Sequence, residues 1–213
     1  AGAAVVAAGV AAAGAAVGAL TYKLFLSGEA ANSADARVRN IAKSMGLFGD
    51  QSDAVAERLN NLADKIELQT GMDGNAIQLT QAKLLTFKEL ANTADELGGN
   101  FDRATQAAVD MAAAGFGAAE QNAVQLGKAL NDPINGLAAL RKSGITFTEE
   151  EQAKIKTLAE SNRMHEAQAL VLAAIEKQVG GTAAATADAS VQIKAALNQG
   201  FEELTKKSLL ARF

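Results

Sequence analysis

The sequence predicts an all-α protein in which a compact multi-helix domain is flanked by an Ala/Gly-rich hydrophobic helix and a C-terminal amphipathic helix. Three observations lead to this prediction. Apolar residues recur at helical spacing along most of the chain, capping residues and glycines separate these stretches, and the 213 residues contain one proline. Because proline breaks helices, its scarcity favours long helical runs.

Composition and charge restrict the functions that the chain can have. Hydrophobic residues make up 49% of the sequence but aromatic residues only 4%, so much of the apolar content is alanine, which buries little surface. The formal net charge of -4 disfavours nucleic-acid binding by a basic face. The chain has no cysteine, which excludes disulfides and thiolate metal sites, and no cofactor is predicted.

Residues 1–26 are predicted to form a hydrophobic helix. The stretch from Ala1 to Tyr22 carries no charge and is long enough to cross a bilayer as a helix. Gly14 and Gly18 have the spacing that lets two helix backbones approach closely. Two interpretations stay open: a membrane-active helix that forms a homo-oligomeric bundle, or an alanine-rich helix packed inside a protein assembly. No basic region precedes the stretch, so we expect a piece of a longer protein rather than a signal peptide.

Residues 29–69 show heptad spacing, which is typical of a coiled-coil seam or a long packed helix. The pattern consists of Ala34, Val38, Ile41, Met45, Phe48, Val55, Leu59, Leu62 and Ile66. Gly46 and Gly49 interrupt it, and each would weaken a continuous helix by about 1 kcal/mol. We therefore expect two helices with a glycine hinge, the second capped by Asp50 or Ser52.

Residues 70–181 are predicted to be the compact helical domain. A turn at 70–75 precedes a helix whose apolar positions are Ile77, Leu84, Phe87 and Leu90. Asn100 follows two glycines and is expected to cap the next helix, and a further helix is expected at 118–130. These short helices, separated by turns, would pack into one body.

The clearest helix boundaries lie between residues 131 and 151. Asp132 is expected to cap a helix that has Pro133 in its first turn, and Gly144 is expected at that helix's C-terminal end. Thr148 and Glu151 have the spacing of a capping box, which begins the following helix. The apolar face of the first helix is expected to consist of Ile134, Leu137 and Leu140. These five boundary residues predict a folding role.

Four segments in the same order carry a family resemblance. They are LADKIELQTGMDGNAIQLTQAKLLTF, FDRATQAAVDMAAA, LGKALNDPINGLAALRKSGITFTEEEQAKIKTL and AQALVLAAIEKQVGGTAAA. They resemble the helical domain of phage tail length tape measure proteins, over about residues 59–185. The family offers no agreed catalytic residue for this region.

The resemblance implies a location and a set of partners. Members of this family are long, mostly helical chains that lie in the lumen of the tail tube and set its length. They are ejected early in infection and are thought to assist DNA passage through the envelope. The implied partners are other copies of the chain, tail tube proteins and tail tip or baseplate proteins, with the host membrane as a further partner after ejection.

An enzymatic role is not expected. His165 is the sole histidine and is interpreted as a surface residue, and Glu149 to Glu151 are interpreted as a solvated first helical turn. The glycine pairs at 98–99 and 180–181 lack the neighbours of a phosphate loop. We thus predict no catalytic, cofactor-binding or metal-binding residue. The alternatives to a structural tail component are a pore-forming infection protein that inserts into membranes and a helical adaptor.

The last stretch, residues 182–213, is predicted to be a linker followed by an amphipathic helix. The apolar stripe of this helix consists of Val191, Ala195, Phe201, Leu204 and Leu209. It could pack on the same chain, pair in a coiled coil or contact another protein of the particle.

Overall fold

The structure is a computed structural model that describes residues 36–187. Within these residues all regular secondary structure is helical. Residues 36–44 form a helix, which is followed by η1 (Gly49–Gln51), α2 (Ser52–Thr70), α3 (Gly74–Leu85), α4 (Lys88–Ala91), α5 (Asn100–Ala113), α6 (Ala119–Asn131), α7 (Pro133–Lys142), α8 (Glu149–Glu160), α9 (Met164–Val179) and α10 (Thr182–Thr186). The all-α class is confirmed for the described residues. The flanking helices predicted at residues 1–26 and after residue 187 lie outside them.

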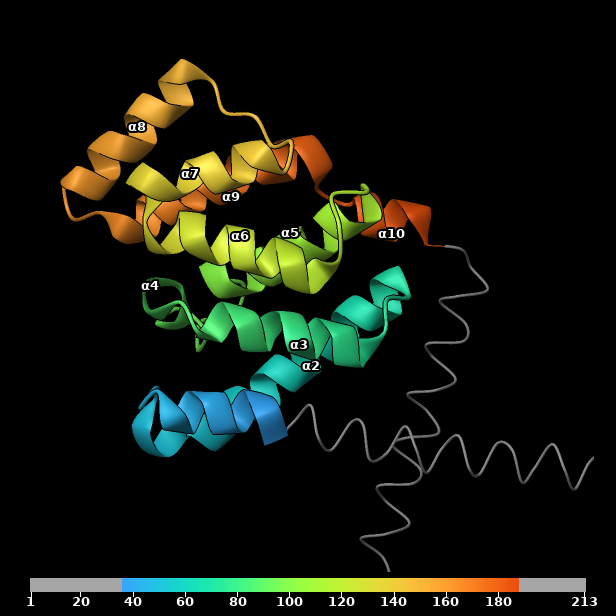
Figure 1. The fold of residues 1–213 in the computed structure, drawn as a ribbon. Helices are drawn as coiled ribbons and strands as arrows, with labels where there is room; N and C mark the ends of the chain where they lie inside the picture. The colour runs from blue at the N-terminus through green and yellow to red at the C-terminus, as the bar shows by residue number, and fades with distance from the viewer. Residues whose placement is uncertain (1–35, 188–213) are drawn as a thin grey trace, which may run out of the picture.

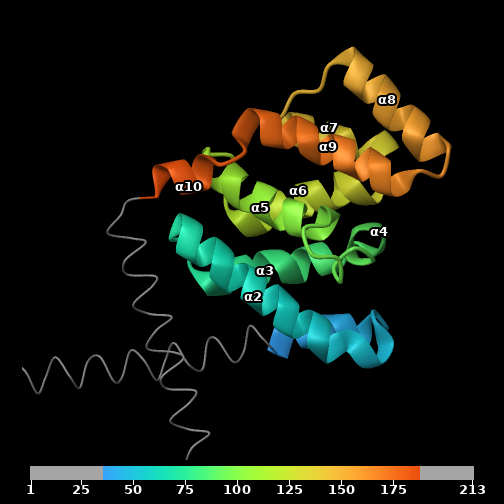
Figure 2. The ribbon, with the colours of Figure 1, turned by 180° about the vertical axis from the view of Figure 1, so that it is seen from behind.

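The helices form a stack that runs from residues 36–51 at one end to α8 at the other (Figures 1 and 2). α3 lies in the middle and contacts α2, α5 and α6. One apolar cluster extends through the stack from Val38 to Val179. It contains side chains from both 29–69 and 70–181, so the described parts of these two predicted segments share a core.

The heptad-patterned segment forms two helices, with a break where its glycines lie. The helix at residues 36–44 ends in a turn at Met45 and Gly46, and Gly46 has a φ of +65°. The buried positions of the heptad pattern include Val38, Val55, Leu59 and Ile66, which pack against side chains of the same chain. Met45 is 39% exposed, so the pattern does not form one continuous buried seam.

The start of α2 differs from the prediction that Asp50 or Ser52 caps it. Gln51 occupies the N-cap position and makes no side-chain capping bond. The Ser52 hydroxyl instead donates to the carbonyl oxygens of Leu47 and Gly49, at 2.9 and 2.7 Å. Ser52 therefore fastens the hinge to the first turn of α2 but leaves the capping position to another residue.

The central helix α3 is covered on most of its sides. Its buried residues are Ile77, Gln78, Thr80, Gln81, Ala82, Leu84 and Leu85. The predicted continuation of this helix to Leu90 is wrong, because α3 ends at Leu85 and Phe87 has an extended conformation before α4. This break places the Phe87 ring against Gly127 of α6, where a helical side chain would leave no room for it.

α7 packs along α6, and α8 packs on α9 and α7. Leu137 and Leu140 of α7 are buried, but Ile134 is 44% exposed, so the predicted three-residue apolar face is wrong at Ile134. α8 buries one residue, Ile155, and presents its other side chains wholly or partly to solvent.

The compact region extends further than residue 181, where a linker was predicted to start. Residues Thr182–Thr186 form α10, which packs on α5 and α2. Ala183 is buried there in a smaller apolar cluster. A stretch of small residues was interpreted as a linker because alanine and threonine leave no strong periodic signal in five residues.

Candidate functional site

The boundary between α6 and α7 is fixed by hydrogen bonds to one carboxylate. Asp132 accepts from the backbone N–H of Asn135 at 3.2 Å and from its side-chain amide at 2.8 Å. Pro133 occupies the first position of α7, where a missing N–H costs nothing. Hydrogen bonding from the Asn135 side chain, helped by backbone bonds, holds the pKa of Asp132 below its ordinary value. Both residues lie where the sequence places them.

The end of α7 is a Schellman motif built around Gly144. Gly144 has a φ of +99° and its N–H donates to the Arg141 carbonyl at 3.1 Å, while the N–H of Ile145 donates to the Leu140 carbonyl at 3.1 Å. A Cβ atom on Gly144 would lie 2.7 Å from Cε1 of Phe116. The position therefore requires glycine for two reasons, its backbone conformation and the ring beside it.

α8 begins with a capping box. The Thr148 hydroxyl accepts from the Glu151 N–H at 3.1 Å, and the Glu151 carboxylate accepts from the Thr148 N–H at 2.9 Å. These reciprocal bonds satisfy two N–H groups that the helix itself cannot satisfy. Asp132, Pro133, Gly144, Thr148 and Glu151 together set the directions of α7 and α8 and present no reactive group to a substrate.

Two glycines allow helices to approach more closely than side chains would permit. A Cβ atom on Gly136 of α7 would lie 2.5 Å from the Cα atom of Ala129 and 2.7 Å from the carbonyl carbon of Lys128. A Cβ atom on Gly127 of α6 would overlap the ring of Phe87. The sequence analysis did not single out either glycine, because a lone glycine inside a helical pattern carries no sign of what faces it.

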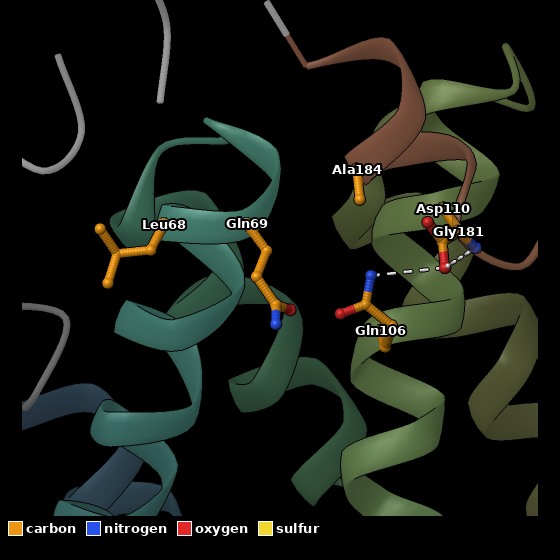
Figure 3. Close-up of a pocket in the computed structure, with 6 residues that line it drawn as sticks. All are labelled: Leu68, Gln69, Gln106, Asp110, Gly181 and Ala184. Carbon is orange, nitrogen blue, oxygen red and sulfur yellow. Dashed lines mark hydrogen bonds between the residues drawn. The ribbon is translucent and has the colours of Figure 1, made fainter. Parts of the chain in front are cut away.

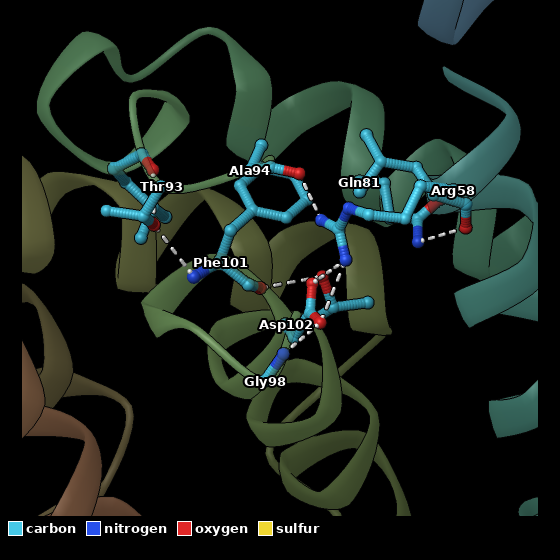
Figure 4. A network of polar contacts seen from close by, with 10 residues as sticks. Arg58, Gln81, Thr93, Ala94, Gly98, Phe101 and Asp102 are labelled. Carbon is cyan, nitrogen blue, oxygen red and sulfur yellow. Dashed lines mark hydrogen bonds and ion pairs between the residues drawn. The ribbon is translucent and has the colours of Figure 1, made fainter. Parts of the chain in front are cut away.

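A polar network joins α2 to the start of α5 (Figure 4). One guanidinium nitrogen of Arg58 lies 3.0 Å from both carboxylate oxygens of Asp102, and the other donates to the carbonyl of Ala94. Asp102 also accepts from the Gly98 N–H at 2.8 Å, and the Thr93 hydroxyl accepts from the N–H at position 101 at 3.0 Å. These bonds satisfy the beginning of α5. Sequence reasoning missed the Arg58–Asp102 pair because 44 residues separate its members.

Asn100 was expected to cap α5, and this prediction is wrong. Gly99 is the N-cap residue, and Asn100 is buried with 2% of its surface exposed. Its side-chain amide donates to the carbonyl of His165 at 2.9 Å and to Gln168 at 3.1 Å. Gln168 in turn donates to the Leu130 carbonyl at 3.0 Å. Asn100 thus links α5 to α9, and through Gln168 to the end of α6.

A second contact between α5 and α9 is ionic. The Arg103 guanidinium donates to both oxygens of the Glu176 carboxylate, each at 2.8 Å. This hydrogen bonding raises the pKa of Arg103 above its ordinary value. Both side chains are partly exposed, so the pair orients the two helices and contributes modestly to stability.

An open hollow lies where α2, α5 and α10 meet (Figure 3). Its lining consists of Leu68, Gln69, Gln106, Asp110, Gly181 and Ala184. Gln69 and Gln106 lie on opposite sides of it, and the Asp110 carboxylate lies next to the Gly181 backbone. Asp110 is 2% exposed and accepts from Gly181, Ala183 and Gln106. Its carboxylate is therefore occupied in holding α10.

The described residues contain no group of three or more histidine, cysteine, aspartate or glutamate side chains that could hold a metal ion. His165 is 55% exposed, and its Nε2 atom lies 3.7 Å from a carboxylate oxygen of Glu96. Glu151 is engaged in the capping box, while Glu149 and Glu150 lie exposed in the same helical turn. The arrangement around these residues brings no nucleophile and base together.

No helix within residues 36–187 is long and apolar enough to span a membrane. The predicted hydrophobic helix at 1–26, with Gly14 and Gly18, lies outside the described residues, as does the predicted amphipathic helix with its stripe from Val191 to Leu209.

Comparisons with protein families, with curated proteins and with solved structures found no match to this chain.

Proposed function

We propose that the chain is a structural component of a phage tail or a related tail-like particle, similar in role to a tape measure protein. It lies in the lumen of the tail tube, takes part in setting tail length and assists genome delivery across the host envelope. Its partners are other copies of itself, the tube, and the tail tip or baseplate. The resemblance over about residues 59–185 carries this proposal.

Two features of the described residues support a structural role. The motifs with the strongest resemblance coincide with the helix boundaries at Asp132–Pro133, Gly144 and Thr148, so they specify how helices are arranged. The most buried polar groups, among them Asp102 and Asn100, are used in contacts between helices. Their chemistry is spent on holding the fold, as expected for a protein that acts through its shape.

The compact shape constrains how such a protein could measure length. The longest described helix, α2, has 19 residues and spans about 28 Å at 1.5 Å per residue. A folded body of this size has a radius of gyration of about 15 Å, and hence a diameter of about 40 Å. One extended helix of the same residues would span about 230 Å. The body therefore contributes a short, folded portion of the tail lumen unless it is unpacked.

Mass spectrometry of purified particles tests the location. We expect peptides from residues 36–187 to co-purify with the tube subunit through a density gradient, at a few copies per particle. The peptides should resist added protease in intact particles and become sensitive once the tube is opened. Peptides that are lost on the gradient, or that are digested equally in intact particles, would exclude the tube lumen and favour the helical adaptor.

A membrane-inserting role is the second candidate, and the uncharged stretch from Ala1 to Tyr22 favours it. Insertion would have to be supported by association, because alanine and glycine contribute little to transfer into a bilayer. The full chain should release dye from loaded liposomes, and Gly14→Leu with Gly18→Leu should reduce the release. No leakage at any protein-to-lipid ratio would exclude this role, and equal leakage would exclude glycine-mediated packing.

A further inference from the structure

α10 is attached to the rest of the body by few contacts. Of its five residues, Ala183 alone is buried, and its methyl group completes the small apolar cluster that includes Ile66 and Val109. A helix of this length is not stable by itself in water. By contrast, α9 buries seven residues, namely Ala167, Gln168, Val171, Leu172, Ala174, Ile175 and Val179. The docking of α10 therefore depends on the groups that receive it.

The Asp110 carboxylate is the main polar group that receives α10. One of its oxygens accepts from the Gly181 N–H at 3.1 Å and the other accepts from the Ala183 N–H at 2.9 Å. The Gln106 side chain donates to the same carboxylate at 3.3 Å. N–H groups in the first turn of a helix lack acceptors within the helix. Asp110 supplies those acceptors from α5, and such charge-assisted bonds are stronger than neutral ones.

The surroundings of α10 leave it open on two sides. One hollow is lined by Leu68, Gln69, Gln106, Asp110, Gly181 and Ala184, and a second by Thr70, Gly71, Met72, Ala113, Ala183, Thr186 and Ala187. No large side chain of α10 is wedged into either one, since the helix consists of alanine and threonine. The Gly180–Gly181 connection, with a φ of +76° at Gly181, turns the chain between α9 and α10.

We propose that α10 is a releasable strap. Residues 181–187 detach from α2 and α5 as a unit while α2 to α9 stay folded, and Asp110 is the latch that holds them. Detachment costs little, because it transfers the Asp110 carboxylate to water instead of leaving it buried without partners. It frees about 25 Å of chain at roughly 3.5 Å per residue. It also exposes the apolar cluster around Ile66 and Val109. The inference rests on the folded body and does not depend on the proposed function.

Hydrogen–deuterium exchange of the full chain, read peptide by peptide, tests the strap. In the unmodified chain, the amides of residues 181–187 should exchange at least about 100-fold faster than those of α9, because local release precedes global unfolding. Asp110→Asn should accelerate exchange at 181–187 by about a further tenfold, with α5 and α9 unchanged. The control Asp95→Asn removes one exposed negative charge elsewhere and should leave α10 unaffected.

A second variant keeps the test decisive if Asp110→Asn fails to fold. Ala183→Gly removes the buried methyl group of α10 without altering α5, and it should produce the same selective acceleration at 181–187. Equal exchange of α10 and α9 in the unmodified chain would overturn the proposal, because release would then require global unfolding. Acceleration that spreads equally over α5 and α9 in the variants would show that Asp110 and Ala183 are general stabilising residues instead of a latch.

Discussion

Replacement of Gly136 by alanine should destabilise the protein, although the same change in an ordinary helix stabilises it by about 1 kcal/mol. The added Cβ atom would lie 2.5 Å from the Cα atom of Ala129, whereas ordinary contacts begin at 3.4 Å. α6 and α7 would have to separate by about 0.9 Å, because backbone atoms cannot rotate away. A gap of this size removes a quarter to a half of the dispersion energy of the contacts across it.

The magnitude follows from the side chains that share this contact. Leu137 and Leu140 of α7 are buried, and fully burying each contributes about 1.5–3 kcal/mol. Overpacking of this kind costs up to about 3 kcal/mol. After subtraction of the gain in helix propensity, we expect a net loss of about 2 kcal/mol. With a typical dependence on urea, the unfolding midpoint should fall by about 1 M.

Urea unfolding of the full chain, followed by circular dichroism, measures this loss. The matched control is Ala138→Gly, on the exposed face of the same helix, which should cost about 1 kcal/mol through propensity alone. An unchanged or raised midpoint for Gly136→Ala would refute the close approach of α6 and α7. A loss no larger than that of the control would show that the two helices separate without affecting the core.

Three further predictions concern the polar contacts. Thr148→Ala should cost about 1 kcal/mol in urea unfolding, whereas Thr157→Ala, inside the exposed part of α8, should be neutral; equal midpoints would exclude the cap. Arg58→Ala should cost about 3 kcal/mol because Asp102 stays buried without its cation, and a double-mutant cycle with Asp102→Asn should show coupling. The pKa of Asp132 is lowered by folding, so its stabilisation is complete above the unfolded value of about 3.9 and is lost as pH falls through the folded one. The stability difference between the parent and Asp132→Ala should therefore narrow below that pH.

Sequence reasoning succeeded where the deciding contacts are local. The capping box needs Thr148 and Glu151, three residues apart, and the turn after α7 needs the backbone freedom of Gly144. The α6–α7 boundary depends on Asp132 and its near neighbour Asn135. Each of these groups forms its bonds within one helical turn, so the residue types and their spacing are sufficient to predict them.

Sequence reasoning failed where the partner is distant. Asn100 has a composition suited to capping, but its amide binds α9, 65 and 68 residues away. Asp110 caps α10 across more than 70 residues, and nothing near it in the sequence indicates that it does. Ile134 fits an apolar face by spacing, yet no element covers it. Such roles depend on how helices are placed against each other, which helical periodicity does not specify.

The central claim, that this chain is a tape-measure-like component of a tail, is tested most directly by tail length. Electron microscopy would compare particles that carry the unmodified gene with particles in which residues 36–187 are deleted in frame. The account predicts a uniform shortening, by about 40 Å if the body is folded in the lumen and by up to about 230 Å if it is stretched into one helix. Unchanged tail lengths, in particles that still incorporate the shortened chain, would contradict the claim.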